Sequence, residues 1–143
     1  MNNLGIAYYN LGKYDKAVEY YEKSLQQTTI NQNEREAAIT LNNLGNVNFD
    51  WSKYDVAISY YEKSLNIKRK LEFKEGMAVS LYNLGNAYLR TKEFNKALNF
   101  FNRSIALAKE LNFKEVIYRN YEAFSTAYSR LGNFQKAFEY HVK

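Results

Sequence analysis

Apolar side chains recur along this chain at steps of three and four residues, the spacing that gathers them on one face of a helix. In the stretch from 33 to 51 these positions are Ala37, Leu41, Leu44, Val47 and Trp51. Asn33 stands just before this stripe as a suitable N-cap, and acidic residues follow it in the first turn. The pattern therefore predicts a helix from about Asn33 to Trp51.

The same pattern continues along the chain, so that helices follow one another with short breaks. Further predicted helices cover residues 54–71, 74–90, 94–111, 114–131 and 134 to the end. Glycine at positions 12 and 132 stands just past a helix, where a left-handed residue costs least. Ser52 and Lys92 occupy the equivalent positions of two other turns, which predicts that these turns close differently or carry some strain. Turns this short make neighbouring helices antiparallel hairpins.

The helix pairs repeat at a fixed step along the chain. The stretch Leu41-Asn42-Asn43-Leu44-Gly45-Asn46 recurs as Leu81-Tyr82-Asn83-Leu84-Gly85-Asn86, and Asn2-Asn3-Leu4-Gly5 is a shorter, earlier copy. Alanine keeps the same register at Ala17, Ala57, Ala97 and Ala137. A fixed period between about 20 and 50 residues marks a protein whose repeats stack on their neighbours. We therefore expect an all-α solenoid of antiparallel helix hairpins.

The period divides this single solenoid domain into four repeats, at residues 1–30, 31–71, 72–111 and 112–143. The first repeat has a truncated first helix and the fourth a truncated second helix, so Met1 and Lys143 would both fall inside helices. Apolar faces would then be uncovered at Met1, Leu4, Phe138 and Tyr140. Such faces predict that the chain is part of a longer array or that a second copy covers its ends.

Glycine inside the first helix of each repeat requires a packing reason, because it costs about 1 kcal/mol relative to alanine there. Close approach of the two helices in a repeat supplies one. We expect the glycines to face the alanines of the second helix, in the pairs Gly5 with Ala17, Gly45 with Ala57, and Gly85 with Ala97. Phe73 and Phe113 are expected to fill the seams between one repeat and the next.

These motifs resemble the tetratricopeptide repeat. The residues that carry the resemblance are Leu84, Gly85, Tyr88, Ala97 and Phe101, with Leu4, Gly5, Tyr8, Ala17 and Tyr21 before them. The period departs from the common one of about 34 residues, the chain has no proline, and the frequent tryptophan is replaced by Leu41, Leu81 and Tyr121. The longer spacing with Asn-Leu-Gly-Asn is similar to spindle-orientation scaffolds, kinesin light chains and bacterial signalling proteins. The resemblance implies a right-handed superhelix whose first helices line a concave groove, with Tyr21, Tyr61 and Phe101 packed against the following repeat.

The resemblance also implies that the groove binds an extended or helical segment of a partner protein. The expected contact residues are Asn42, Asn43, Asn46, Phe49, Tyr82, Asn83, Asn86, Arg90 and Arg130. An amide side chain both donates and accepts hydrogen bonds, so a ladder of asparagines suits a peptide backbone. The alternative is that asparagine is simply abundant in this chain. The lysines of the family's carboxylate clamp are replaced by Asn42 and Tyr82, which argues against capture of a free C-terminal carboxylate.

Composition narrows the remaining functions. The net charge of +5 and the pI near 9.2 leave nucleic-acid binding as a weaker alternative, because lysine and arginine alternate with glutamate as on solvated helix faces. One histidine, His141, no cysteine and no phosphate-binding loop predict no enzyme, metal or cofactor. The chain lacks a long apolar run and a secretory signal, so we expect no membrane association and a cytoplasmic protein. We expect a protein-binding scaffold within a larger signalling or assembly protein, or alternatively a self-assembly module that pairs through its terminal helices.

Overall fold

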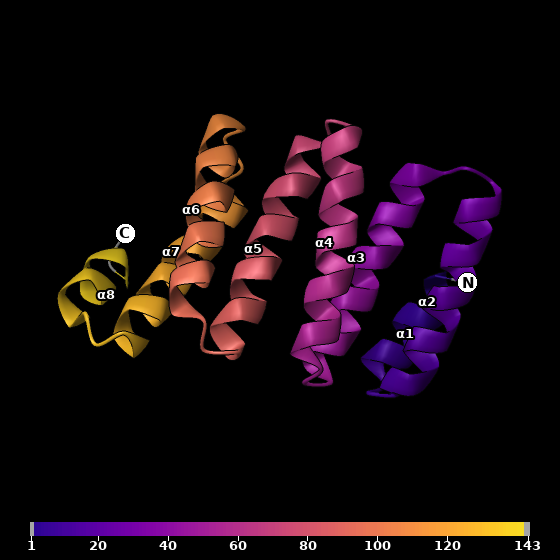
Figure 1. Cartoon of the computed structure of the whole chain (residues 1–143), viewed down its shortest axis with the longest axis horizontal. Helices are drawn as coiled ribbons and strands as arrows, with labels where there is room; N and C mark the ends of the chain where they lie inside the picture. Colours follow the sequence, from indigo (N-terminus) through magenta and orange to yellow (C-terminus); the bar gives the residue numbers. More distant parts are fainter. Residues whose placement is uncertain (1, 142–143) are drawn as a thin grey trace. The chain divides into compact units, whose positions relative to one another are not determined.

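A computed structural model describes residues 2–141, apart from the side chains of Asn2, Phe134 and His141. Met1 and Lys143, which were expected in the terminal helices, and the His141 side chain lie outside the described residues. The described chain forms eight α-helices: α1 Asn2–Asn10, α2 Tyr14–Ile30, α3 Glu34–Asp50, α4 Tyr54–Lys70, α5 Lys74–Arg90, α6 Phe94–Glu110, α7 Lys114–Arg130 and α8 Phe134–His141 (Figure 1).

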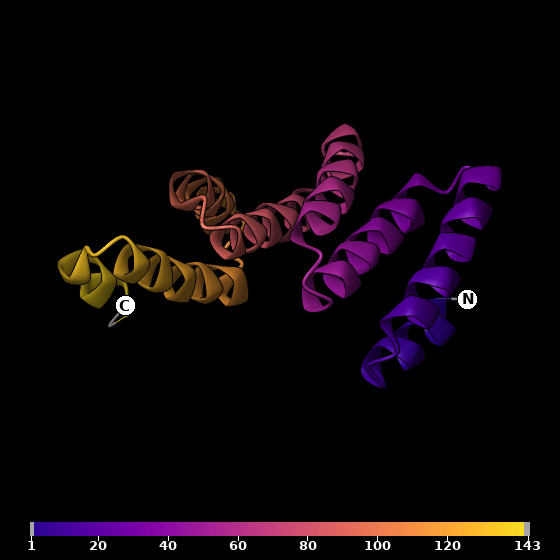
Figure 2. The ribbon, with the colours of Figure 1, turned by 60° about the horizontal axis from the view of Figure 1, so that its bottom comes forward.

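The helices belong to two compact units. Residues 1–72 hold α1 to α4, and residues 73–143 hold α5 to α8. Within each unit, successive helices form antiparallel hairpins; Figure 2 shows α1 beside α2 and α3 beside α4 in the first unit. Each hairpin pairs the first and second helix of one sequence repeat, as the pattern predicted.

The helix positions agree with the prediction to within one residue at each end. The stretch predicted at 33–51 is α3, Glu34–Asp50, because Asn33 and Trp51 are its caps rather than helical residues. The Asn33 side chain accepts a hydrogen bond from the Glu36 backbone N–H at 3.2 Å and donates one to the Glu36 carboxylate at 3.1 Å. This reciprocal pairing satisfies a backbone donor at the helix start, so the predicted N-cap is confirmed.

All the turns are built alike. A residue of positive φ stands at positions 12, 32, 52, 72, 92, 112 and 132, evenly spaced along the chain. In the turn after α3 the Lys53 N–H bonds to the Asn48 carbonyl at 2.8 Å and the Ser52 N–H to the Phe49 carbonyl at 3.0 Å, the Schellman pattern. The expectation of a different closure at Ser52 and Lys92 is wrong, since both residues adopt the left-handed conformation at φ of 62° and 67°. They carry the strain that Gly12 and Gly132 avoid.

The repeat is longer than the common period because each of its helices is long. The internal helices, α2 to α7, each have 17 residues. A turn of the same short length separates each helix from the next. One helix and one turn make a uniform element, and two such elements make the period seen in the sequence.

The glycines of the first helices lie against aromatic rings. A Cβ atom added to Gly45 would lie 2.4 Å from a ring carbon of Tyr61, and one added to Gly85 would lie 2.5 Å from a ring carbon of Phe101. Gly5 has the same relation to Tyr21, at 2.7 Å. The expectation that these glycines face Ala17, Ala57 and Ala97 is therefore wrong in its partner. The alanines are fully buried, but the space that glycine leaves is taken by the ring one helical turn further along the second helix.

The same rings join neighbouring repeats within each unit. In the first unit Tyr21 belongs to a buried cluster with Leu44 and Val47 of α3. In the second unit the ring of Phe101 meets that of Phe124 on α7, with centroids 5.9 Å apart in an edge-to-face arrangement. Tyr21 and Phe101 thus each pack on the glycine of their own repeat and on the first helix of the next one, as the resemblance implied.

Two further contacts hold the hairpins. The buried Ser64 hydroxyl donates to the Ala38 carbonyl at 2.7 Å, and Ser104 donates to the Ala78 carbonyl at 2.8 Å. In the second unit Phe113 packs against the buried cluster that holds Ala108 of α6 and Val116 of α7, which confirms its predicted place in the seam. These bonds and contacts fix the separation of the helices.

Apolar side chains remain exposed on the outermost helices. Leu4 on α1 is 49% exposed and Phe138 on α8 is 67% exposed, whereas Leu44 and Leu84 are fully buried. Tyr140 does not belong to the uncovered set, because its ring stacks on Phe124 at 4.7 Å. Ala137, the last alanine of the repeat motif, is buried.

Candidate functional site

The expected contact residues of the first unit lie on α3. Asn42, Asn43 and Asn46 are half-buried there. The Asn46 side-chain oxygen accepts a hydrogen bond of 2.6 Å from the Tyr61 hydroxyl. Burial, followed by the nearby charge of Asp50, raises the pKa of Tyr61, so this hydroxyl stays protonated and donates. The bond orients the Asn46 amide and leaves its NH₂ group directed away from Tyr61.

Phe49 and its neighbours form the last turn of the same helix. Phe49 is half-buried and meets Tyr54 edge to face, with ring centroids 5.4 Å apart. The Tyr9 hydroxyl of α1 donates to the carboxylate of Asp50. Burial, together with this bond and the carboxylate charge, raises the pKa of Tyr9. The Asp50 carboxylate is therefore already engaged within the unit.

The second unit presents the equivalent residues on α5. Tyr82, Asn83 and Asn86 are half-buried, and Tyr82 lies 6.0 Å from Phe101, ring to ring. Phe101 stands where the first unit has Tyr61, so it has no hydroxyl with which to orient Asn86. Arg90 at the end of α5 is exposed. Arg130, at the end of α7, is exposed as well.

The structure therefore gathers Asn42, Asn43, Asn46 and Phe49 on one helix of the first unit, and Tyr82, Asn83, Asn86 and Arg90 on one helix of the second. The hydrogen bond between Tyr61 and Asn46 was not predicted from the pattern of residues. Its signal is the tyrosine at position 61 where the other unit has phenylalanine at 101.

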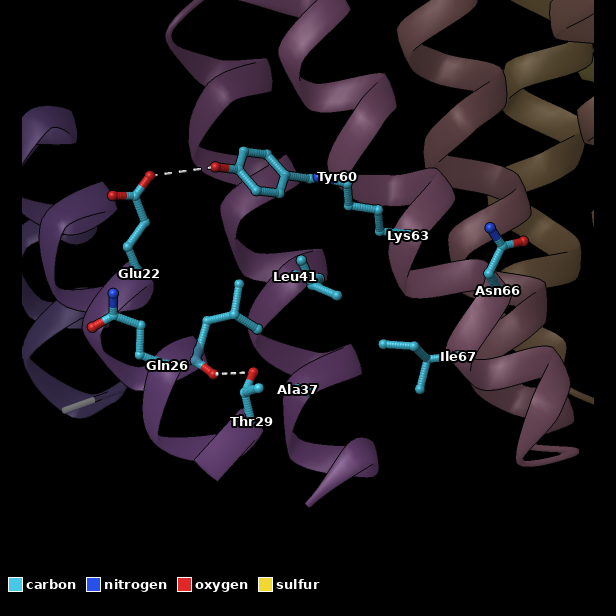
Figure 3. A pocket seen from close by; sticks show the side chains of 10 residues that line it. Glu22, Gln26, Thr29, Ala37, Leu41, Tyr60, Lys63, Asn66 and Ile67 are labelled. Atoms are coloured by element: carbon cyan, nitrogen blue, oxygen red, sulfur yellow. Dashed lines mark hydrogen bonds between the residues drawn. The ribbon is translucent and has the colours of Figure 1, made fainter. Parts of the chain in front are cut away.

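A cavity of about 660 Å³ lies in the first unit, and none of the expected contact residues lines it. It opens between α2 and α4, with α3 beneath it (Figure 3). The lining residues are Glu22, Leu25, Gln26 and Thr29 of α2, Ala37 and Leu41 of α3, and Tyr60, Lys63, Asn66 and Ile67 of α4. We call this cavity the α2–α4 trough.

The α2–α4 trough has an apolar base and polar edges. Leu41 and Ala37 lie between its walls in Figure 3, with Glu22 and Gln26 on one side and Lys63 and Asn66 on the other. The Tyr60 hydroxyl spans one end and donates to the Glu22 carboxylate at 3.4 Å. Burial, together with the Glu22 charge, raises the pKa of Tyr60 and keeps this hydroxyl protonated.

Other kinds of site have little support in the described residues. Among the side chains that the structure describes, no three or more from His, Cys, Asp or Glu gather in a way that would hold a metal ion. The helices of residues 2–141 also include none with the length and apolar character needed to cross a bilayer. The amide-bearing helices and the α2–α4 trough are thus the two surfaces that merit a functional interpretation.

The sequence profile of the tetratricopeptide repeat matches residues 1–70, 36–110 and 76–143. The chain belongs to the tetratricopeptide repeat family. The resemblance drawn from the Leu-Gly motif is thereby confirmed, together with the all-α solenoid fold class. No curated protein matches the sequence.

Solved structures of other proteins share this fold. BtubC (BKLC) from P. vanneervenii has a TM-score of 0.87 and 25% identity, over 97% of this chain and 58% of its own. Aspartyl phosphate phosphatase F from Bacillus subtilis has a TM-score of 0.91 and 20% identity, over 99% of this chain and 37% of its own. The Rap conjugation gene regulator of plasmid pLS20, solved in complex with the Phr* peptide, has a TM-score of 0.85 and 18% identity, over 96% of this chain and 38% of its own. The chain thus spans little more than half of the first of these proteins and less than two fifths of the other two.

Proposed function

We propose that the chain is a protein-binding module that holds segments of a partner protein against the amide-bearing faces of α3 in the first unit and α5 in the second. The family and fold are those of protein-interaction modules, and one protein of this fold was solved with a bound peptide. The module would serve as a scaffold or sensor within a larger assembly. Its role is recognition rather than chemistry.

The observation that carries this proposal is the recurrence of two amides around the motif glycine. Asn43 and Asn83 stand two residues before it, and Asn46 and Asn86 stand one residue after it. The glycine side of each helix is occupied by an aromatic ring, while all four amides remain partly accessible. Amides at such positions offer paired donors and acceptors to a peptide backbone.

The two amide faces differ in whether a neighbouring hydroxyl group orients one of their amides. In the first unit the Tyr61 hydroxyl fixes Asn46, so this amide presents its donors in one orientation. In the second unit Phe101 leaves Asn86 without that constraint. A fixed amide loses less side-chain entropy on binding than a rotating one. We therefore expect Asn46 to contribute more to peptide affinity than Asn86.

Peptides selected from a display library against the chain provide the test. Asn43→Ala combined with Asn83→Ala should weaken their binding by about 0.5–1.5 kcal/mol for each hydrogen bond lost. The helical circular dichroism and the melting temperature should stay nearly unchanged, since both side chains lie at the partly accessible surface of their helices and surface substitutions usually alter stability by only about 0.5 kcal/mol.

The matched control is Asn95→Ala with Asn102→Ala, which removes two exposed amides from α6. This variant should bind the selected peptides as the wild type does. Equal binding by the Asn43/Asn83 variant and the wild type would overturn the assignment of the amide faces.

A further inference from the structure

The α2–α4 trough is about two helical turns long. Its α2 wall runs from Glu22 to Thr29 and its α4 wall from Tyr60 to Ile67. Each wall therefore extends about 10 Å along its helix axis, at roughly 1.5 Å per residue. The two walls run in the same direction, because both helices are antiparallel to α3, which lies between them. The result is an open channel with a helix on each side.

The trough exists because this repeat departs from the pattern of the others. Ala37 stands where the later repeats have Met77 and Ile117, and Asn33 stands where they have phenylalanine. In the second unit the corresponding contact between α6 and α7 is filled by Phe113 and Ile117, which pack together with Ala108 and Val116. Ala37 lines the trough, so its small side chain leaves a hollow where the second unit has a packed seam.

A third departure turns Tyr60 toward this hollow. Its equivalents stack in parallel on a tyrosine of the first helix: Tyr20 on Tyr8 at 5.3 Å, Phe100 on Tyr88 at 5.4 Å and Tyr140 on Tyr128 at 5.7 Å. Position 48 is asparagine instead, and its side chain is buried and donates to the Leu44 carbonyl at 2.8 Å. Tyr60 therefore lacks the stacked ring, lines the trough and bonds to Glu22.

The two walls of the trough carry opposite charges, Glu22 on α2 and Lys63 on α4, so an acidic ligand group would be placed on the α4 side. Glu22 is engaged by the Tyr60 hydroxyl. Lys63 has its ammonium 5.8 Å from the centre of the Tyr60 ring and forms no ion pair within the described residues. An incoming carboxylate beside the apolar base would pair with Lys63.

We propose that the α2–α4 trough binds a short amphipathic helix of a partner protein, whose apolar side chains seat over Ala37 and Leu41 and whose acidic side chain pairs with Lys63. Two helical walls and an apolar base match the helix-in-groove mode, in which side chains one turn apart are the anchors. The site is separate from the amide faces, because α3 contributes Ala37 and Leu41 to the trough while Asn43 and Asn46 line no part of it. The chain would then engage two partner segments at once.

The decisive variant fills the trough with the residue that another repeat already uses. Ala37→Ile copies Ile117, so the fold should tolerate it, and it removes the space for an anchor side chain. Ala106→Ile makes the same chemical change at an exposed position of α6 and serves as the matched control. Lys63→Glu reverses the charge at an exposed position without touching the base. Circular dichroism of each variant verifies the fold.

The probes are peptides of about 15 residues, long enough to become helical, selected from a display library on the wild-type chain. Peptides that use the trough should carry two apolar residues one turn apart and a neighbouring acid. Their dissociation constants should rise at least about tenfold with Ala37→Ile and stay unchanged with Ala106→Ile and with Asn43→Ala plus Asn83→Ala. Selection on Lys63→Glu should exchange the acid for a lysine or arginine.

Three results would overturn the proposal. The first is that selection enriches no helical peptide, and the second is that the enriched peptides bind Ala37→Ile as tightly as the wild type. The third is that decanoate binds the wild type and not Ala37→Ile while no peptide does, which would make the trough a site for small amphipathic acids.

Discussion

Gly45→Ala sets helix propensity against packing. Alanine is the better helix former by about 1 kcal/mol, so α3 alone would favour the substitution. The added methyl carbon, however, would lie 2.4 Å from a ring carbon of Tyr61, where ordinary contacts are 3.4–4 Å. The methyl group and the ring would therefore overlap severely.

The ring has little room to retreat. Tyr61 is only 2% exposed, and its hydroxyl is anchored to the Asn46 side chain at 2.6 Å. Overpacking of this kind costs about 1–3 kcal/mol. After the gain in helix propensity is subtracted, we expect Gly45→Ala to lower the free energy of unfolding by on the order of 1 kcal/mol, which lowers the melting temperature by about 3 °C.

A double-mutant cycle isolates the contact. In a Tyr61→Leu background the ring is gone, so Gly45→Ala should become stabilising by up to about 1 kcal/mol. Thermal and urea unfolding followed by circular dichroism measure both backgrounds, and Gly85→Ala with Phe101→Leu repeats the cycle in the second unit. If Gly45→Ala raises the melting temperature of the otherwise wild-type chain, the ring does not fill the space beside the glycine and the packing argument fails.

Two other predictions concern the turns and a buried lysine. Ser52→Gly should stabilise the chain by about 0.5–1 kcal/mol, because it replaces a serine held in the left-handed conformation. Gly12→Ala should cost about 1 kcal/mol through its backbone alone, since a Cβ atom there meets nothing within 4 Å. Chemical unfolding would show either effect, and variants as stable as the wild type would contradict the strain. Burial lowers the pKa of Lys68 from 10.5 to about 8. Between these pH values the unfolded chain holds a proton that the folded chain has released, so the free energy of unfolding should rise with pH by on the order of 3 kcal/mol. Lys68→Met should remove that rise in unfolding experiments at a series of pH values, and an unchanged pH profile would refute the assignment.

The helices and their pairing were predictable because they depend on local patterns. Apolar spacing located α3 to within one residue, and Asn33 acted as the N-cap that its position suggested. The closure of the turn at Ser52 was not predictable from propensity, because packing of long helices on both sides imposes one turn geometry on whatever residue stands there. The partner of Gly45 was also missed. Both an alanine and an aromatic recur in register, and only the three-dimensional packing shows which of them fills the gap.

The sequence was sufficient to assign the expected contact residues to helices, but it did not predict the side-chain contacts that orient them. Periodicity assigns Asn43 and Asn46 to α3, yet the hydrogen bond that orients Asn46 comes from Tyr61, 15 residues away. The α2–α4 trough depends on missing side chains rather than on a motif. Its signal in the sequence was the set of positions where the second repeat breaks the common pattern, with Ala37 the clearest of them.

The uniform turns have a consequence for how such a chain grows. Because every internal helix with its turn occupies the same number of positions, duplication or loss of a whole hairpin would join identical geometries and leave each neighbouring hairpin intact. Insertion or loss of a single helix with its turn would instead put a glycine-bearing first helix in the place of an aromatic-bearing second helix. Two glycine faces, or two aromatic faces, would then meet. The genes of such arrays should therefore vary in length by whole hairpins, and a single altered copy, such as the one with Ala37, can acquire a separate binding role while its neighbours keep the array folded.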